Sequence, residues 1–141
     1  MTALVHLAEV TEAPIDAQAI KALVSHSTTG AVVVFSGDVR DHDHGRSVVS
    51  LTYEGHPSAQ EVLENVVRDF AEYSEVTAIA AVHRIGKIPI GQAALVVAVG
   101  SAHRGDAFTA TATLVDLIKE KLPVWKHQFF ADGTDEWVNC A

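Results

Sequence analysis

The pattern of apolar and polar residues along the chain predicts a mixture of strands and helices. Apolar runs rich in β-branched residues are typical of strands, and they occupy residues 4–10, 31–35, 76–85 and 93–101. Val49, Leu51 and Tyr53 alternate with polar residues, which predicts a further, half-buried strand. A short last strand is expected at Trp137 and Val138.

Three segments carry helix signals. Asp16 is expected to cap a short amphipathic helix, and Ser58 followed by Glu61 is a capping-box pattern that opens a second one. A third helix is predicted over residues 105–121 and is ended by Pro123. The second helix has apolar residues at i, i+3 and i+4 spacing, namely Ala59, Val62, Leu63, Val66, Val67 and Phe70.

The connections between these elements are short. Residues 36–38 suggest a bulge or turn, residues 41–46 form a polar loop, and residues 86–91 make a hairpin-like link. Helices mixed among strands with hairpin-length links favour an α+β fold over a doubly wound sheet. We expect mostly antiparallel strands with three helices, in a single domain covering residues 1–141.

Composition narrows the class of protein. Of 141 residues, 48% are hydrophobic and 20% are charged, as in ordinary globular proteins. No apolar run approaches the ~18 residues of a membrane span, and the first residues lack the basic and apolar regions of a secretory signal. We therefore expect a cytoplasmic protein that does not span a membrane.

Charge and cysteine content exclude further classes. The net charge of −8 disfavours nucleic-acid binding, because such binding needs a basic face. Cys140 is the one cysteine, so no disulfide framework exists within the chain. Its place next to the C-terminus argues against a catalytic thiol, since a low thiol pKa needs a built environment.

In so acidic a chain, cations that converge would indicate an anionic ligand. His103 and Arg104 precede the third helix, where free N–H groups and the helix dipole favour an anion. Lys119 falls on the edge of that helix's inner stripe, formed by Phe108, Thr111, Val115, Ile118 and Leu122. Partial desolvation there would lower its pKa and make it a base or nucleophile. The alternatives are a surface ion pair for Arg104 and a snorkelling lysine at 119.

Two more cations extend this anion site. Lys126 follows Pro123 and Trp125, which should hold it on a rigid segment, and Arg40 follows a predicted strand. Arg40 could equally be an exposed loop residue. The run Asp41-His42-Asp43-His44 resembles a metal cluster, but neighbouring residues on one loop seldom converge on an ion, so no metal is expected. His83, on an apolar strand, has the pattern of a structural histidine.

Five segments, in order, resemble the large subunit of molybdopterin synthase, the MoaE family. They are residues 35–40 (FSGDVR), 51–54 (LTYE), 82–86 (VHRIG), 101–104 (SAHR) and 119–126 with its PVWK end. The resemblance covers nearly the whole chain and implies an α/β-hammerhead fold. It also implies a homodimer within a heterotetramer, in which each large subunit binds a small ubiquitin-like subunit with a thiocarboxylate on its C-terminal Gly-Gly tail. The implied reaction converts cyclic pyranopterin monophosphate to molybdopterin by two sulfur transfers, without a cofactor.

The resemblance also implies roles for individual residues. Lys119 and Lys126 match the family's catalytic lysines, and both also face the substrate. The other matched substrate-binding positions are Asp38, Val39, Arg40, His103, Arg104, His127 and Gln128. At the last two positions the family usually has a basic residue and Glu.

Two other functions remain open from the sequence. One is a catalytically silent scaffold that binds a ubiquitin-like partner, although both lysines would then be unnecessary. The other is an anion-binding or phosphate-ester enzyme without a protein partner. Binding to a small protein that ends in Gly-Gly separates this last possibility from the other two.

Overall fold

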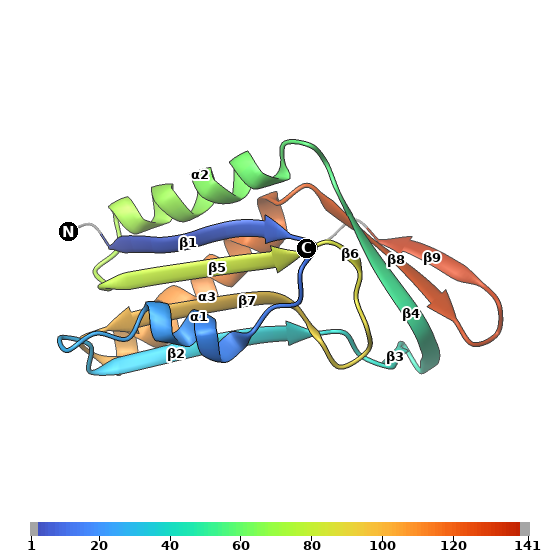
Figure 1. Ribbon diagram of the computed structural model, residues 1–141, viewed down its shortest axis with the longest axis horizontal. Helices are drawn as coiled ribbons and strands as arrows, with labels where there is room; N and C mark the ends of the chain where they lie inside the picture. The colour runs from blue at the N-terminus through green and yellow to red at the C-terminus, as the bar shows by residue number, and fades with distance from the viewer. Residues whose placement is uncertain (1–2, 139–141) are drawn as a thin grey trace.

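The computed structural model describes residues 3–138 and confirms the α+β class, with three helices among short strands (Figure 1). One strand pair, β1 with β5, is parallel, and the other pairs are antiparallel. Among the described residues no helix is long and apolar enough to cross a membrane. The elements are β1 (Leu4–Thr11), α1 (Ala17–Leu23), β2 (Ala31–Asp38), β3 (His42–Asp43), β4 (Arg46–Gly55), α2 (Ala59–Glu72), β5 (Ala78–Arg84), β6 (Gly86–Lys87), β7 (Ala93–Ser101), α3 (Arg104–Lys121), β8 (Val124–Phe130) and β9 (Asp135–Val138).

A four-stranded sheet in the order β1-β5-β7-β2 forms the centre of the fold. Helices α2 and α3 cover one face and α1 lies on the other, so every residue of β5 is buried. Side chains alternate across a strand. Ile79 and Ala81 therefore join the core under α2 and α3, whereas Ala80 and Val82 face α1. His83 lies on the same face as Ile79 and Ala81, at the end of the strand.

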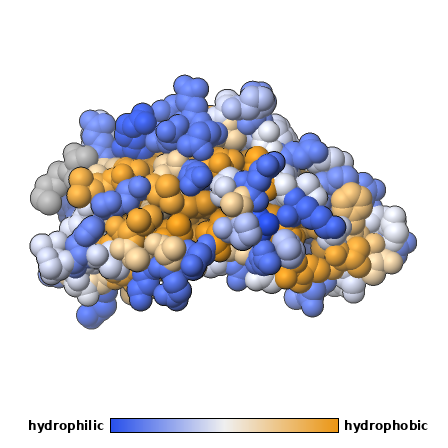
Figure 2. Space-filling model, in the orientation of Figure 1, coloured by the Kyte–Doolittle hydropathy of each residue, from blue (hydrophilic) through white to orange (hydrophobic). Residues whose placement is uncertain are grey.

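Helix α1 begins as the sequence predicts. Oδ1 of Asp16 accepts hydrogen bonds from the backbone N–H groups of Gln18 and Ala19, at 3.0 and 3.4 Å. The helix has only seven residues and covers part of its sheet face. Figure 2 shows apolar side chains that remain in view over this sheet, and Leu4 of β1 is 63% exposed.

The second sheet has the order β3-β4-β8-β9, with β6 also paired to β4. It extends from one end of the first sheet (Figure 1). The sequence analysis missed β8, because its polar residues 126–128 break the alternation typical of a strand. This segment becomes a strand by pairing with β4, which is distant in the sequence, and Lys126 lies opposite Tyr53. Within the expected polar loop, His42 and Asp43 form the short strand β3, paired with β4.

Three local expectations were wrong. Val49 is 57% exposed, because a register shift between Val48 and Ser50 turns Val48 into the core instead. Phe108 is 62% exposed and lies outside the buried stripe of α3. Ser58 has helical backbone angles and makes no capping hydrogen bond, so the capping box does not form.

Candidate functional site

A cavity of about 160 Å³ opens where the two sheets meet. The ends of β2, β5 and β7, the last turn of α3, and strands β3, β4 and β8 of the second sheet contribute to its wall. The lining residues are Phe35, Gly37, Asp38, Val39, Arg40, His42, Asp43, Leu51, Tyr53, His83, Ala94, Leu95, Lys119, Lys126 and Gln128. Six of the nine residues that the sequence singled out as site residues therefore meet at one place.

Two lysines reach this cavity from different elements. Lys119 lies in the last turn of α3, and its side chain is exposed rather than partly desolvated as the stripe predicted. Lys126 is half-buried on β8. Residues 122 and 123 alone separate the helix from the strand, so the same turn sets the positions of both lysines.

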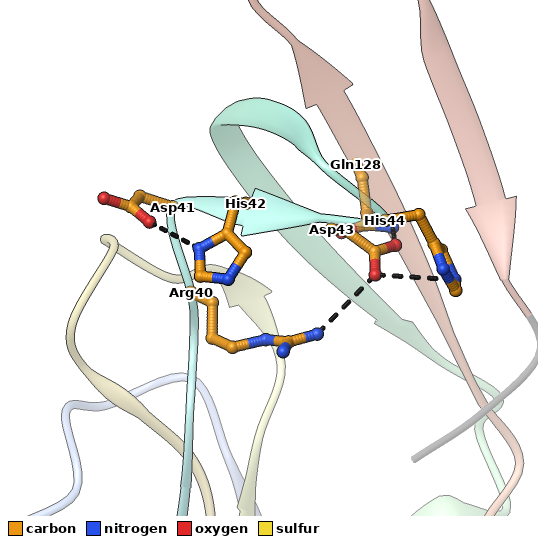
Figure 3. Close-up of polar contacts among 6 residues, drawn as sticks. All are labelled: Arg40, Asp41, His42, Asp43, His44 and Gln128. Carbon is orange, nitrogen blue, oxygen red and sulfur yellow. Dashed lines mark hydrogen bonds and ion pairs between the residues drawn. The ribbon is translucent and has the colours of Figure 1, made fainter.

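Arg40 belongs to a polar cluster at the mouth of the cavity (Figure 3). One oxygen of Asp43 lies 3.6 Å from the Arg40 guanidinium and 3.7 Å from Nε2 of His44. The other oxygen accepts a hydrogen bond of 2.9 Å from the amide of Gln128. This hydrogen bond is the main cause that lowers the pKa of Asp43, and the charges of Lys126, Arg40 and the protonated form of His44 act in the same direction. Asp43 is thus an ionised carboxylate among cations.

The remaining pair of the Asp41–His44 run has a different contact. Nδ1 of His42 lies 2.9 Å from Oδ1 of Asp41, and this hydrogen bond lowers the pKa of Asp41. Figure 3 shows the two side chains turned toward each other, apart from the Asp43 contacts. Within residues 3–138, no group of three or more histidine, cysteine or acidic side chains is placed to hold a metal.

His103 and Arg104 lie away from this cavity. They sit at the N-terminal end of α3 and border a separate hollow with Gly30 and Ala102. Helix α3 has 18 residues, and at 1.5 Å per residue it is ~27 Å long. Lys119 is at its other end. The five cations that the sequence suggested for one anion pocket are therefore divided between two places in one chain.

Comparison with known proteins identifies the family. The sequence model described as MoaE protein matches residues 10–121. The chain belongs to the MoaE family. A molybdopterin synthase catalytic subunit of Nostoc is 38% identical over 92% of this chain and 80% of its own length. The corresponding protein of Bacillus subtilis is 36% identical over 92% of this chain and 83% of its own length.

Solved structures of MoaE proteins share the fold. Molybdopterin synthase from Staphylococcus aureus superposes with a TM-score of 0.83 at 32% identity, and the match covers 93% of this chain and 96% of that one. A Helicobacter pylori chain, solved in a complex of subunits 1 and 2 of molybdopterin-converting factor, has a TM-score of 0.71 at 18% identity and supports the fold alone. The assignment made from the five sequence segments, to a catalytic subunit of molybdopterin synthase and an enzyme of molybdenum cofactor biosynthesis, is confirmed.

His127 and Gln128, both expected from the resemblance to bind the substrate, lie on opposite faces of β8. Gln128 is 2% exposed and lines the cavity. His127 points the other way, stacks on the Trp137 ring with a centroid separation of 4.0 Å, and approaches Asp135 at 2.6 Å. A contact between His127 and a substrate in this cavity is therefore not supported by the structure.

His83 and Asp43 are cavity residues that the sequence analysis did not select. His83 has no exposed surface, and its ring meets that of Tyr53 edge-on, with centroids 5.0 Å apart. Its Nδ1 is 2.8 Å from the carbonyl oxygen of Arg84, but within the described residues its buried Nε2 has no hydrogen-bond partner. An unpaired buried polar atom costs about 1–3 kcal/mol. His83 is thus buried, as expected of a structural histidine, but only one of its two ring nitrogens has a hydrogen-bond partner among the described residues.

Proposed function

We propose that this chain binds cyclic pyranopterin monophosphate at the cavity and transfers two sulfurs to it from the thiocarboxylated tail of a small ubiquitin-like subunit, in the cytoplasm. The observation that carries the proposal is the meeting of Lys119, Lys126 and Arg40 at one cavity in a chain of net charge −8. A phosphate and a thiocarboxylate are both anions. Cations that converge in an acidic protein bind and orient such groups.

The two lysines suit different parts of the reaction. In each transfer sulfur replaces oxygen on a side-chain carbon of the pterin: a C–S bond forms, a C–O bond at the same carbon breaks with its oxygen leaving as water or as a phosphate oxygen, and the acyl C–S bond of the tail breaks. The tail then ends as a carboxylate whose new oxygen comes from water. We assign Lys119 to the tail carbonyl, where an ammonium stabilises negative charge on oxygen and supplies a proton. Lys126 and Arg40 then hold the anionic substrate, with Asp38 and Val39 beside them.

The position of His103 and Arg104 supports a dimeric site. Since α3 keeps these residues far from Lys119, they can serve the same substrate only if a second copy brings its helix N-terminus to the cavity. The volume of about 160 Å³ agrees with this, because ligand pockets usually measure ~300–1,000 Å³. We therefore propose a homodimer in which one chain supplies the lysines and the other supplies His103 and Arg104.

The partner is proposed to be the small subunit, one bound to each large subunit in a heterotetramer. The Helicobacter pylori structure is of a complex between subunits 1 and 2 of its converting factor. A sulfur donor from outside is also consistent with a chain that has one cysteine, at position 140. Cys140 lies outside the described residues.

Reconstitution tests this function. The purified chain is mixed with a thiocarboxylated small subunit and cyclic pyranopterin monophosphate, and molybdopterin is measured. We expect product only when both proteins are present, none with Lys119→Ala, and normal product with Lys121→Ala, a matched control on the same helix that does not line the cavity. Binding of the small subunit without product would favour the silent scaffold. If neither binding nor product is observed, the result would favour an anion-binding enzyme that has no protein partner.

A further inference from the structure

The buried imidazole of His83 forms part of the cavity wall without a role in the reaction described above. It is at the end of β5, opposite Leu95 of β7, on the sheet face that α2 and α3 cover. Its ring is fully enclosed and edge-on to Tyr53, at an interplanar angle of 82°. Burial and the contact with Tyr53 thus hold the side chain in one orientation.

The hydrogen bond at Nδ1 fixes the tautomer of His83. A backbone carbonyl can only accept, so Nδ1, 2.8 Å from the carbonyl oxygen of Arg84, carries the proton. Nε2 is then a lone-pair acceptor. Burial lowers the pKa of His83 to about 4, and the positive charge of Lys119 also lowers it, against the opposing effect of the Arg84 hydrogen bond. The ring is therefore neutral at neutral pH.

Nε2 of His83 is a buried acceptor without a hydrogen bond in the described part of the chain, and this needs an explanation. An apolar ring of similar size at this position would avoid the free-energy cost of the unpaired nitrogen. Nε2 exposes less than 1 Å² and has no partner among residues 3–138. Within this chain, a donor can come from a side chain that shares the cavity wall. Tyr53 contacts the ring, and Lys126 lies opposite Tyr53 in the pairing of β4 with β8. Lys119 lines the same cavity as His83, from the helix that covers this face of the sheet, and its positive charge acts on the ring.

We propose that His83 is a positioning residue, whose Nε2 accepts a hydrogen bond from the Lys119 ammonium when the partner's tail occupies the cavity. This inference rests on the proposed function, since it describes how Lys119 is placed for that reaction. A lysine side chain has many rotamers, and ordering it costs conformational entropy. A buried acceptor at the cavity wall selects the one that directs the ammonium inward.

Three variants at one position test the inference. The amide nitrogen of His83→Asn can replace the Nδ1 donor toward Arg84 but leaves nothing at the place of Nε2. His83→Gln reaches that place with an acceptor, and His83→Phe keeps the packing alone. We expect kcat to fall at least about tenfold in the Asn and Phe variants, with KM for the pterin and small-subunit affinity changed less than about twofold. His83→Gln should retain most of the activity, and the Tm of His83→Phe should equal or exceed that of the wild type.

A second measurement does not depend on turnover. In ¹⁵N NMR of histidine-labelled complex with the small subunit, the Nε2 resonance of His83 should move upfield on binding, as an acceptor nitrogen does, and Lys119→Ala should abolish the movement. An unmoved resonance would overturn the inference, as would full activity of His83→Asn or an equal loss with lowered Tm in all three variants. If the wild type makes no molybdopterin, the proposed function fails, and the NMR result alone decides the role of His83.

Discussion

Gln128 and Asp43 form a partly buried amide–carboxylate pair, in which Nε2 of Gln128 donates to Oδ2 of Asp43 at 2.9 Å. Gln128 is 2% exposed and the Asp43 side chain 16% exposed. An amide can donate to a carboxylate, whereas an ionised glutamate at position 128 could not. The glutamine and the aspartate of β3 are therefore matched to each other in this chain.

This pairing predicts that Gln128→Glu is destabilising. Two carboxylates would meet in a buried place, and we expect the free energy of unfolding at pH 7 to fall by about 2–4 kcal/mol, measured in urea. The deficit should shrink toward pH 5, because the pair can then share a proton. Combining Gln128→Glu with Asp43→Asn reverses the pair and should restore most of the stability. A single variant as stable as the wild type would contradict the pairing.

A shared site between two copies predicts complementation between inactive variants. Lys119→Ala and Arg104→Ala homodimers should each lose most of their turnover. A hybrid dimer would carry one intact site and one site that lacks both side chains. After equal mixing and free exchange of subunits, about half of the dimers are hybrids, so about a quarter of the wild-type activity should return. Lys119→Ala mixed with Lys126→Ala is the control, because both lysines come from the same chain, and it should restore none. No recovery in the first mixture would show that the site lies within one chain.

The buried neutral His83 predicts a loss of stability in mild acid. Its pKa is lowered from 6.5 to about 4 in the folded protein. Between these values the unfolded chain binds a proton that the folded chain does not, so stability is complete above pH 6.5 and falls as the pH drops toward 4. We expect the free energy of unfolding at pH 5 to be about 2 kcal/mol below that at pH 7.5.

A variant at position 83 tests whether His83 causes this loss of stability in acid. His83→Phe should remove this pH-dependent part of the free energy of unfolding. The carboxyl groups with lowered pKa, Asp41, Asp43 and Asp132, contribute stability that is lost only as the pH falls below their ordinary value of 3.8, which is a separate window. An unchanged pH slope in His83→Phe would show that the ring titrates normally in the folded protein.

Delivery of sulfur by a partner predicts that the chain needs no thiol. Cys140→Ser should turn over at the wild-type rate in the reconstituted reaction with a thiocarboxylated small subunit. Replacement of the thiocarboxylate by a carboxylate should abolish product in the wild type and the variant alike. Loss of activity in Cys140→Ser alone would instead indicate a sulfur carrier on this chain.

Local pattern was enough to predict much of the fold. The three helices, Asp16 as a helix cap, and the strands around residues 31–35 and 93–101 follow from periodicity and capping chemistry that act over a few residues. The strand β8 does not, because its residues take strand conformation by pairing with β4, some seventy positions earlier. Lys126 and Gln128 face the cavity while His127 faces away, and this alternation becomes visible only once the strand is known.

The sequence by itself determined which chemistry is available: an acidic chain with a few cations, one cysteine, and five segments of the MoaE family in order. Only the tertiary structure decided which of those groups meet. It joined Arg40, Lys119 and Lys126, brought Asp43 and the unpaired His83 to the same cavity, and kept His103 and Arg104 at the far end of α3. The physical reason is that a helix is a rod of fixed length, whereas cavity walls form from contacts between distant parts of the chain, which no local spacing records.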